Sequence, residues 1–213
     1  MLANGNPIWA IVVAAGSGNR FGGQKQFEQL EGRRVVDWSL AACRSVADGI
    51  VLVVPADHDA PEAADIVVNG GATRSGSVRA GLAEVPEEAA VIVVHDAARP
   101  FAPPALFEAV VAAIRNGADG AVPGVAVTDT IKQVAGEQVV ATLDRDSLVS
   151  VQTPQAFTAD ALRRAHAGGG EGTDDAALVE AAGGRVVVVP GHAANTKITL
   201  RADLESGEQR SAL

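Results

Sequence analysis

A glycine-rich segment with two cations is the first part of the sequence whose residues could perform chemistry. It runs Ala14-Ala15-Gly16-Ser17-Gly18 and continues through Arg20 to Lys25. Glycines let a backbone approach an anion closely and point its N–H groups at it. The two cations would suit a triphosphate whose β,γ-part leaves as an anion. The alternative interpretation is an ordinary flexible turn with solvated cations.

The segment matches neither of two common phosphate-binding fingerprints. A Walker A loop requires the pattern G-x-x-x-x-G-K-[ST], which the segment lacks. A dinucleotide fingerprint requires Gly or Ala where Phe21 stands, and the interval to Gly22 is one residue too long. The spacing therefore argues against an NAD(P)-dependent oxidoreductase.

Two further segments carry side chains suited to a ligand. The segment Gly70–Ser77 precedes a candidate helix, where Ser75 or Ser77 could form the N-cap and the helix N-terminus could bind an anion. The segment His95–Pro100 places Asp96 beside small residues, where a carboxylate could hold a metal ion or a sugar hydroxyl. The alternatives are a capped glycine turn for the first segment and an internal Asp–Arg ion pair for the second.

Lysine is rare in a chain that otherwise uses arginine as its cation. Of the 17 cations, only Lys25, Lys132 and Lys197 are lysines. A compact ammonium charge and a planar guanidinium are not interchangeable, so a lysine kept against this bias is a candidate for a chemical role. Chance is the alternative explanation for a set this small.

Short runs rich in Val and Ile alternate with Ala- and Leu-rich stretches of helical length. The runs are nearly continuous in apolar residues, as in strands buried on both faces of a parallel sheet. This order predicts an α/β fold in which a mostly parallel, twisted open sheet has helices on both faces. The expected strands are Ile8–Ala14, Gly49–Val54, Ala64–Val68, Ala90–His95, Gly120–Val125 and Arg185–Pro190. The expected helices are Val35–Ala47, Ser75–Ala83, Pro103–Asn116, Ala159–Ala167 and Asp174–Ala182.

Residues 126–150 interrupt this alternation. Thr128–Val134 and Gln138–Leu143 are expected to form a β-hairpin around Ala135-Gly136-Glu137. The hairpin has no good apolar face, and an isolated two-stranded hairpin is marginally stable in water. We therefore expect the hairpin to pack on another surface, such as that of a second subunit, and the whole chain to form a single domain spanning residues 1–213.

Composition and charge argue against several classes of protein. The 213 residues carry 17 Lys+Arg against 26 Asp+Glu, a net charge of −9 without a cationic cluster, which disfavours nucleic-acid binding. The longest apolar run, Ile8–Ala15, is far shorter than the ~18 residues that span a bilayer. No cation precedes this run, which argues against a signal peptide. Without a spanning segment or a signal peptide, a cytoplasmic protein without membrane contact is expected. The single Cys43 allows no internal disulfide and no cysteine-based zinc site.

Seven motifs occur in an order that resembles the 2-C-methyl-D-erythritol 4-phosphate cytidylyltransferases, the CTP-using enzymes of the non-mevalonate isoprenoid pathway. The resemblance runs from about Ile8 to Leu204, and each motif is weak alone. All three lysines lie within the motifs, which answers the chance explanation. The motifs are Ala14–Gly22 with Lys25-Gln26-Phe27, Gly70-Gly71 with Arg74 and Ser77, His95–Pro100, Asp129–Lys132, Gln152–Gln155, Thr173-Asp174, and Asn195 with Lys197-Ile198-Thr199.

The resemblance implies a Rossmann-like nucleotidyltransferase fold whose hairpin arm is exchanged in a homodimer. The nucleotide-binding residues that it implies are Ala14, Ala15, Gly16, Ser17, Gly18, Gly70, Gly71, Arg74, Ser77, Asp96 and Ala97. The residues implied to bind methylerythritol phosphate are Asp96, Arg99, Thr130, Thr153, Thr173 and Lys197, with Arg145 from the partner subunit. The implied catalytic residues are Arg20, Lys25, Arg145 and Lys197, and the implied ligand of Mg²⁺ is Asp96.

The implied reaction transfers CMP from CTP to methylerythritol 4-phosphate and gives 4-diphosphocytidyl-2-C-methyl-D-erythritol and pyrophosphate. The attacking phosphate is already anionic near pH 7 because its second pKa is ~6. No general base is therefore required. Catalysis would come from positioning two polyanions and stabilising their charge.

The chain departs from the family pattern at two places. Gln24 stands where a proline often precedes the lysine of the first loop, and Ala193-Ala194 stand where an acidic residue often precedes Asn195. One alternative is a ribitol 5-phosphate cytidylyltransferase, although Lys132 and the position of Arg145 favour methylerythritol phosphate. Two others are a sugar-1-phosphate nucleotidylyltransferase using UTP or GTP, and a non-catalytic nucleotide-binding module on the same fold.

Overall fold

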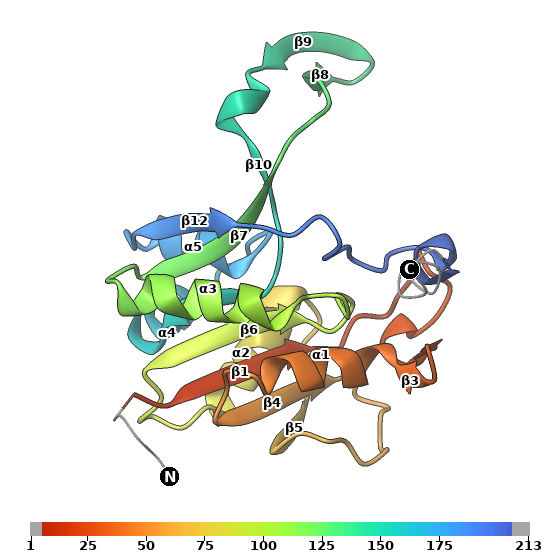
Figure 1. Cartoon of the computed structure of the whole chain (residues 1–213), viewed down its shortest axis with the longest axis vertical. Helices are drawn as coiled ribbons and strands as arrows, with labels where there is room; N and C mark the ends of the chain where they lie inside the picture. The colour runs from red at the N-terminus through yellow and green to blue at the C-terminus, as the bar shows by residue number, and fades with distance from the viewer. Residues whose placement is uncertain (1–5, 206–213) are drawn as a thin grey trace.

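The computed structural model describes residues 6–205 and confirms an α/β fold built on one mixed sheet (Figure 1). Its strands are β1 (Ile8–Val13), β4 (Gly49–Val54), β5 (Ile66–Asn69), β6 (Val91–Asp96), β7 (Gly120–Ala126), β10 (Val149–Val151), β11 (Gln155–Thr158) and β12 (Val186–Pro190). They lie in the order β10-β7-β11-β6-β1-β4-β5, and β12 pairs with β7. The four strands β6, β1, β4 and β5 are mutually parallel, as are β7 and β12.

Helices cover both faces of the sheet, as the buried strands predict. The helices α1 (Val35–Cys43) and α3 (Pro104–Arg115) pack on one face, and Ala10 and Val12 of β1 point into the apolar cluster beneath them. On the other face lie α2 (Arg74–Glu84), α4 (Ala159–Ala167) and α5 (Asp175–Ala181). Ile11 belongs to the cluster under those helices, because successive side chains of a strand point to opposite faces.

Two strands of the sheet are absent from the sequence-based expectation. β11 inserts between β6 and β7 and is antiparallel to both, and Phe157 in it is fully buried. β10 pairs antiparallel with the end of β7. Both strands are only three or four residues long, so neither carries enough residues to show a periodic pattern.

The N-cap of α2 differs from the expected one. The Thr73 hydroxyl accepts a hydrogen bond from the Gly76 backbone N–H at 3.0 Å, so Thr73 is the cap, and the expectation of Ser75 or Ser77 is wrong. Both serines lie inside the first turn and are buried. The cap of α5 is Asp174, whose Oδ1 accepts from the backbone N–H of Ala177 at 3.0 Å.

The hairpin consists of β8 (Ile131–Ala135) and β9 (Gln138–Leu143), which form a separate two-stranded sheet. Figure 1 shows it standing away from the body of the molecule, which it joins through β7 and β10. Val134, Val139 and Val140 are each more than half exposed on it. Exposed apolar side chains on an isolated hairpin indicate a surface that a partner could cover. The use of this hairpin in dimerisation stays a prediction.

Short elements complete the chain between the main strands. β2 (Gln29–Leu30) pairs with β3 (Arg33–Arg34), and single 3-10 turns occur at η1 (Lys25–Phe27) and η2 (Arg145–Ser147). Within residues 6–205, no helix combines the length and the apolar character needed to cross a bilayer.

Candidate active site

A cavity of about 360 Å³ opens where the parallel strands end, beyond the carboxyl ends of β1 and β6. This is the place where open α/β sheets bind their ligands. The cavity is lined by Val13, Ala14, Ala15, Gly16, Ser17, Gly18, Lys25, Gln26, Gly71, Ala72, Thr73, Arg74, Ser77, Asp96, Ala97, Ala98 and Lys197. The structure therefore brings together most of the residues that the sequence predicts to bind a nucleotide.

A second cavity of about 310 Å³ lies next to the first. It is lined by Arg74, Asp96, Arg99, Val151, Gln152, Thr153, Gln155, Thr173, Asp174 and Lys197. Arg74, Asp96 and Lys197 line both cavities. These three charged side chains thus form the border between two adjacent binding spaces.

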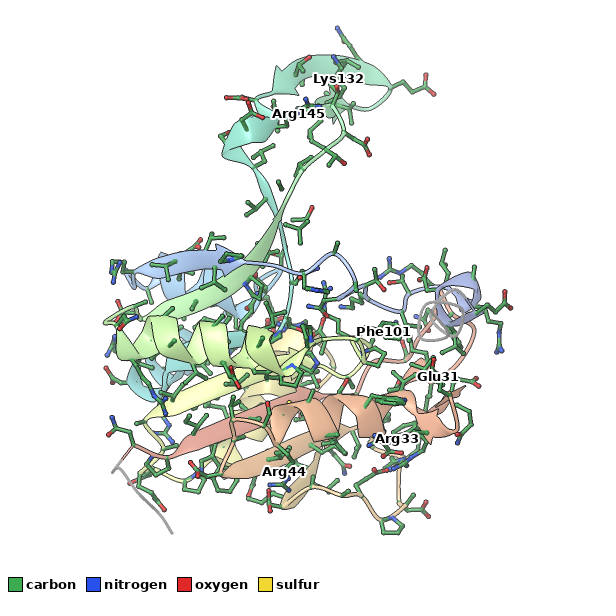
Figure 2. The ribbon with its side chains drawn as sticks, in the orientation of Figure 1. Glu31, Arg33, Arg44, Phe101, Lys132 and Arg145 are labelled. Atoms are coloured by element: carbon green, nitrogen blue, oxygen red, sulfur yellow. The ribbon has the colours of Figure 1, made fainter. Side chains whose placement is uncertain are left out.

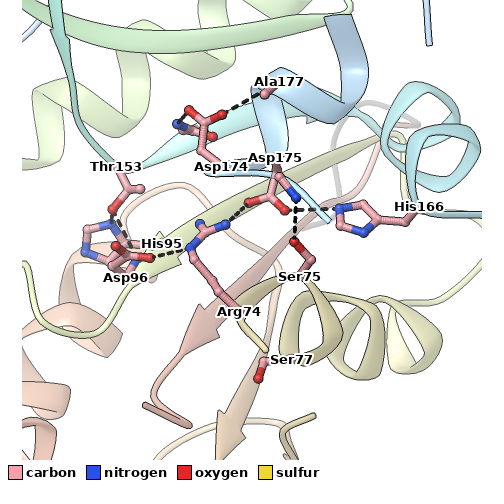
Figure 3. Close-up of polar contacts among 12 residues, drawn as sticks. Arg74, Ser75, Ser77, His95, Asp96, Thr153, His166, Asp174, Asp175 and Ala177 are labelled. Atoms are coloured by element: carbon pink, nitrogen blue, oxygen red, sulfur yellow. Dashed lines mark hydrogen bonds and ion pairs between the residues drawn. The ribbon is translucent and has the colours of Figure 1, made fainter. Parts of the chain in front are cut away.

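Asp96 contacts both of the other border residues, and Figure 3 shows its contact with Arg74. Its Oδ2 lies 2.6 Å from Lys197 Nζ and its Oδ1 lies 3.3 Å from Arg74 Nε. Burial alone would raise the pKa of the Asp96 carboxyl, but the charges of Arg74 and Lys197 outweigh burial and hold that pKa well below its usual range. Asp96 is therefore ionised at every physiological pH. The ion pair with Arg99, considered as an alternative from the sequence, is not formed within the described residues.

His95, the neighbour of Asp96 on β6, is a neutral imidazole that hydrogen-bonds on both sides of its ring. Its Nδ1 lies 3.2 Å from the Thr153 hydroxyl, and its Nε2 lies 3.2 Å from the Arg99 carbonyl oxygen. A carbonyl can only accept, so the proton is assigned to Nε2, and Nδ1 accepts from the hydroxyl. That hydroxyl also accepts the Asp96 backbone N–H at 3.0 Å. Thr153 thereby fixes the end of β6, and its side chain is already engaged by the protein.

The first loop is shaped by a buried glutamine. Gln26 Nε2 donates to the carbonyl oxygens of Ala14 at 2.7 Å and Gly16 at 3.2 Å. Gly18 has φ +66°, and a Cβ there would lie 1.8 Å from the Gly23 carbonyl oxygen, so only glycine fits. Gln26 lies within one of the sequence motifs, but the sequence does not indicate this role. The role depends on the loop folding so that Gln26 meets the carbonyl oxygens of Ala14 and Gly16.

Lys25 lines the first cavity, whereas Arg20 is exposed beside it. Partial burial lowers the pKa of Lys25, and the neighbouring charges of Lys197 and Arg20 lower it further. Lys25, Arg74 and Lys197 thus line one cavity with Arg20 nearby, and four cations suit a polyanionic ligand. Gln24, the departure noted in the sequence, is the N-cap residue of η1 and makes no side-chain capping hydrogen bond.

The second glycine pair allows two loops to approach closely. A Cβ at Gly70 would lie 2.3 Å from the Ala15 Cβ, and one at Gly71 would lie 2.9 Å from the Gly76 backbone carbon. Gly70 is not itself a lining residue of the first cavity, whereas Gly71 and Ser77 are. The Ser77 hydroxyl donates to the Thr73 carbonyl at 2.9 Å.

Polar side chains fix the walls of the second cavity by joining segments that are distant in the sequence. Arg99 Nη1 donates to the Asn195 carbonyl at 2.8 Å, and Gln152 Nε2 donates to the His192 carbonyl at 3.0 Å. Asn195 Nδ2 donates to the Thr153 carbonyl at 2.9 Å. These contacts hold the last loop against the segment before β11, so that Lys197 reaches Asp96.

Besides Arg20 and Gly70, two predicted site residues of the hairpin segment lie outside both cavities. Thr130 precedes β8, and Arg145 begins η2 after the hairpin; Figure 2 shows Arg145 on the arm that stands away from the sheet. The Arg145 guanidinium is exposed and donates from Nη1 to the Thr128 carbonyl at 2.6 Å. Within one chain the structure does not bring these two residues to the site.

Asp96 is the one carboxylate among the residues that line the first cavity. Across residues 6–205, no group of three or more His, Cys, Asp or Glu side chains could form a complete metal cage. Magnesium is commonly held by one or two carboxylates together with substrate phosphates and waters. The donor set therefore fits an ion that arrives with a nucleotide, and does not fit a preformed all-protein site.

Replacement of His95 by glutamine is expected to remove part of the pH dependence of stability. Burial lowers the pKa of His95 from 6.5 to about 4, so between these values the unfolded chain binds a proton that the folded chain does not. Stability is therefore lost as the pH falls through this window, by about 2 kcal/mol between pH 7 and pH 5. Urea unfolding of both proteins at the two pH values measures the effect. An equal loss in the His95→Gln protein would contradict the assignment.

Comparison with known proteins agrees with this geometry. A sequence model of the family described as IspD, 2-C-methyl-D-erythritol 4-phosphate cytidylyltransferase, matches residues 8–210. A protein of that name from Saccharopolyspora erythraea is 43% identical, over 94% of this chain and 97% of its own length. A crystal structure of one from Thermus thermophilus superposes with a TM-score of 0.83 at 34% identity, covering 95% of this chain and 98% of that chain.

Other relatives are longer than this chain. A "Bifunctional enzyme IspD/IspF" from Clavibacter michiganensis is 44% identical over 97% of this chain, which spans 55% of that relative. The chain spans about half the length of several such bifunctional relatives. The matches nevertheless cover nearly the whole of the sequence described above. The chain therefore belongs to the 2-C-methyl-D-erythritol 4-phosphate cytidylyltransferase family.

Proposed function

We propose that the protein transfers CMP from CTP to 2-C-methyl-D-erythritol 4-phosphate, releasing pyrophosphate. The observation that carries this proposal is the shared border of the two cavities, where Arg74, Asp96 and Lys197 line both. A nucleotidyl transfer needs two phosphorylated substrates whose reacting groups meet at one place. Two adjacent spaces with two cations between them suit that requirement.

The nucleotide is assigned to the first cavity. The loop Ala14–Gly18 offers backbone N–H groups to the phosphates, and Lys25 adds a charge from the same side. Gly71 and Ser77 bound the opposite wall, where the close approach of the two loops leaves limited room for a base. Arg20, exposed beside Lys25, is placed to neutralise the departing pyrophosphate.

The acceptor is assigned to the second cavity. Arg99, Thr173 and Lys197 line it, and Lys197 lies at its border with the nucleotide. Arg145 and Thr130 would reach this cavity from a partner subunit, since neither lines it within one chain and Figure 2 shows Arg145 on the arm away from the sheet. The proposal therefore includes a homodimer formed through the hairpin.

The chemical step forms one bond and breaks one. A 4-phosphate oxygen of the acceptor bonds to the α-phosphorus of CTP, and the bond from that phosphorus to the bridging oxygen of pyrophosphate breaks. Lys197 orients the attacking phosphate, while Lys25 and Arg20 stabilise charge on the leaving group. The attacking phosphate needs no general base, because its second pKa is ~6. The neutral, fully buried His95 is accordingly left with a structural role.

Magnesium is proposed as the cofactor. When bound, it would neutralise charge on the triphosphate oxygens, and Asp96, which lines the first cavity, would hold it. Asp96 would then exchange part of its contact with Arg74 or Lys197 for the ion.

We further propose that the protein acts in the cytoplasm, in keeping with one buried, unpaired cysteine, Cys43.

The reaction is tested directly by measuring pyrophosphate release with Mg²⁺, CTP and methylerythritol 4-phosphate. Parallel reactions replace the acceptor with ribitol 5-phosphate, or CTP with UTP. Release only with CTP and methylerythritol 4-phosphate is the expected result. Release with ribitol 5-phosphate would keep the chemistry but overturn the acceptor. Binding of CTP without release from any pair would point to a non-catalytic nucleotide-binding module.

Removal of either loop cation is expected to slow turnover with the fold intact. Lys25→Ala and Arg20→Ala should each lower kcat by ~10²-fold or more, because each group stabilises charge that develops in the transition state. The matched control is Arg115→Ala, which removes an exposed cation at the end of α3, before the amino end of β7. Near wild-type turnover in either loop variant would refute its role.

The exchange of the hairpin is testable with mixed dimers. Lys25→Ala and Arg145→Ala chains, carrying different tags, are co-expressed and the hybrid is isolated. If Arg145 acts on the partner's cavity, each hybrid has one intact site and should show about half the wild-type turnover. If Arg145 acts within its own chain, neither site of the hybrid is intact and the hybrid stays as inactive as the two parent variants.

A further inference from the structure

Two buried polar residues lie behind Arg74 and take no part in the chemistry proposed above. Asp175, the first residue of α5, has a side chain that is 0% exposed, and His166 in α4 is 2% exposed. Asp175 Oδ2 lies 2.8 Å from Arg74 Nη1, and Asp175 Oδ1 lies 3.0 Å from His166 Nε2. Figure 3 shows the row His166–Asp175–Arg74–Asp96 running from the helix layer to the cavity border.

The hydrogen bonding of His166 has a single direction. A carboxylate can only accept, so His166 Nε2 carries the proton that it donates to Asp175. The other ring nitrogen, Nδ1, is buried without a hydrogen-bond partner in the described part of the chain. Leaving a buried polar atom unpaired costs free energy that an apolar side chain would avoid. The one polar contact of this ring is therefore its bond to Asp175.

Asp175 in turn fixes the plane of the Arg74 guanidinium. Arg74 donates from Nε to Asp96 on β6 and from Nη1 to Asp175 on α5, so two carboxylates from different elements hold it. Nη2 makes no hydrogen bond to any residue between 6 and 205. Arg74 is one-quarter exposed and lines both cavities. Its unused N–H groups are therefore left for a ligand.

We propose that Asp175, held in place by His166, is a positioning residue that orients Arg74 toward the nucleotide at the cavity border. The inference rests on the proposed function, because it identifies the ligand of Arg74 as CTP. Charge-assisted hydrogen bonds to a buried carboxylate are strong and directional, which suits the task of holding a flexible arginine in one orientation. Asp175 and His166 themselves touch no substrate.

The first test compares two aspartate-to-asparagine substitutions. An amide accepts on one side only, so Asp175→Asn cannot accept from both Arg74 and His166. We expect it to lower kcat/KM for CTP by ~10-fold or more, since small misplacements of a positioning group are costly to catalysis. Asp160→Asn in α4 is the control, because it removes an exposed carboxylate that pairs only with Arg164 among the described residues. It should stay within about twofold of wild type.

A double-mutant cycle separates positioning from general structural support. If Asp175 acts through Arg74, Asp175→Asn should cause no further loss of kcat/KM for CTP in an Arg74→Ala background, because coupled residues are non-additive. Thermal unfolding of all four proteins accounts for any loss of fold. An equal loss from Asp175→Asn in both backgrounds would overturn the inference.

Two substitutions of His166 test whether its hydrogen bond to Asp175 matters. His166→Leu removes the donor and fills the space, whereas the side-chain amide of His166→Gln can donate from a position near that of Nε2. The Leu variant should show the same loss in kcat/KM for CTP as Asp175→Asn, and the Gln variant should recover most of it. Equal activity of the two variants would show that the hydrogen bond to Asp175 is irrelevant.

A measurement without substrate distinguishes failure of the inference from failure of the proposed function. The Nη1–H signal of Arg74, identified in ¹⁵N NMR spectra by its absence from Arg74→Lys, should exchange slowly with solvent in the wild type because Nη1 donates to the buried Asp175. Asp175→Asn should speed that exchange by ~10-fold or more, and Asp160→Asn should not change it. Unchanged exchange in Asp175→Asn would overturn the inference. If exchange responds as expected but the wild type transfers no CMP, the proposed function fails and the positioning contact stands.

Discussion

One buried carboxylate, Asp96, determines how the rest of the site is arranged. A carboxylate removed from water is costly unless it is paired, so its position at the end of β6 demands nearby cations. Arg74 is supplied by α2, 22 residues earlier, and Lys197 by the last loop, 101 residues later. The same two cations then stand between the cavities. One set of side chains therefore pairs the buried charge and also lines the two spaces that we propose for two anionic substrates.

Hydrogen bonds of uncharged side chains hold Asp96 and the loop that carries Lys197 in this arrangement. Thr153 accepts the Asp96 backbone N–H and donates to His95, while Asn195 and Gln152 tie the last loop to the segment before β11. The Thr153 bonds join the end of β6 to the segment before β11, and the Gln152 and Asn195 bonds join that segment to the last loop. Together with the bond from Arg99 to the Asn195 carbonyl, they hold the last loop where Lys197 reaches Asp96.

The parts of this structure that were predictable from the sequence are those with a local cause. β4 and α4 have the bounds that their apolar patterns predict, and the loop after β1 forms part of the cavity because strand ends gather at one edge. β11 was missed because four residues show no period. The roles of Gln26 and Asp175 were missed because each depends on a contact that only the folded chain creates. The hairpin residues Thr130 and Arg145 remain predicted site residues, since one chain alone does not bring them to the cavities.

The insertion of β11 between β6 and β7 has a consequence for how the chain is made. β6 precedes β11 by about sixty residues, so a chain emerging from the ribosome presents β6 with one edge unpaired while β7 and the hairpin are synthesised. The sheet becomes continuous only when Gln155–Thr158 arrive, and Lys197 follows later still. The border between the two cavities is therefore completed late in synthesis, after both β11 and the loop that carries Lys197 have emerged.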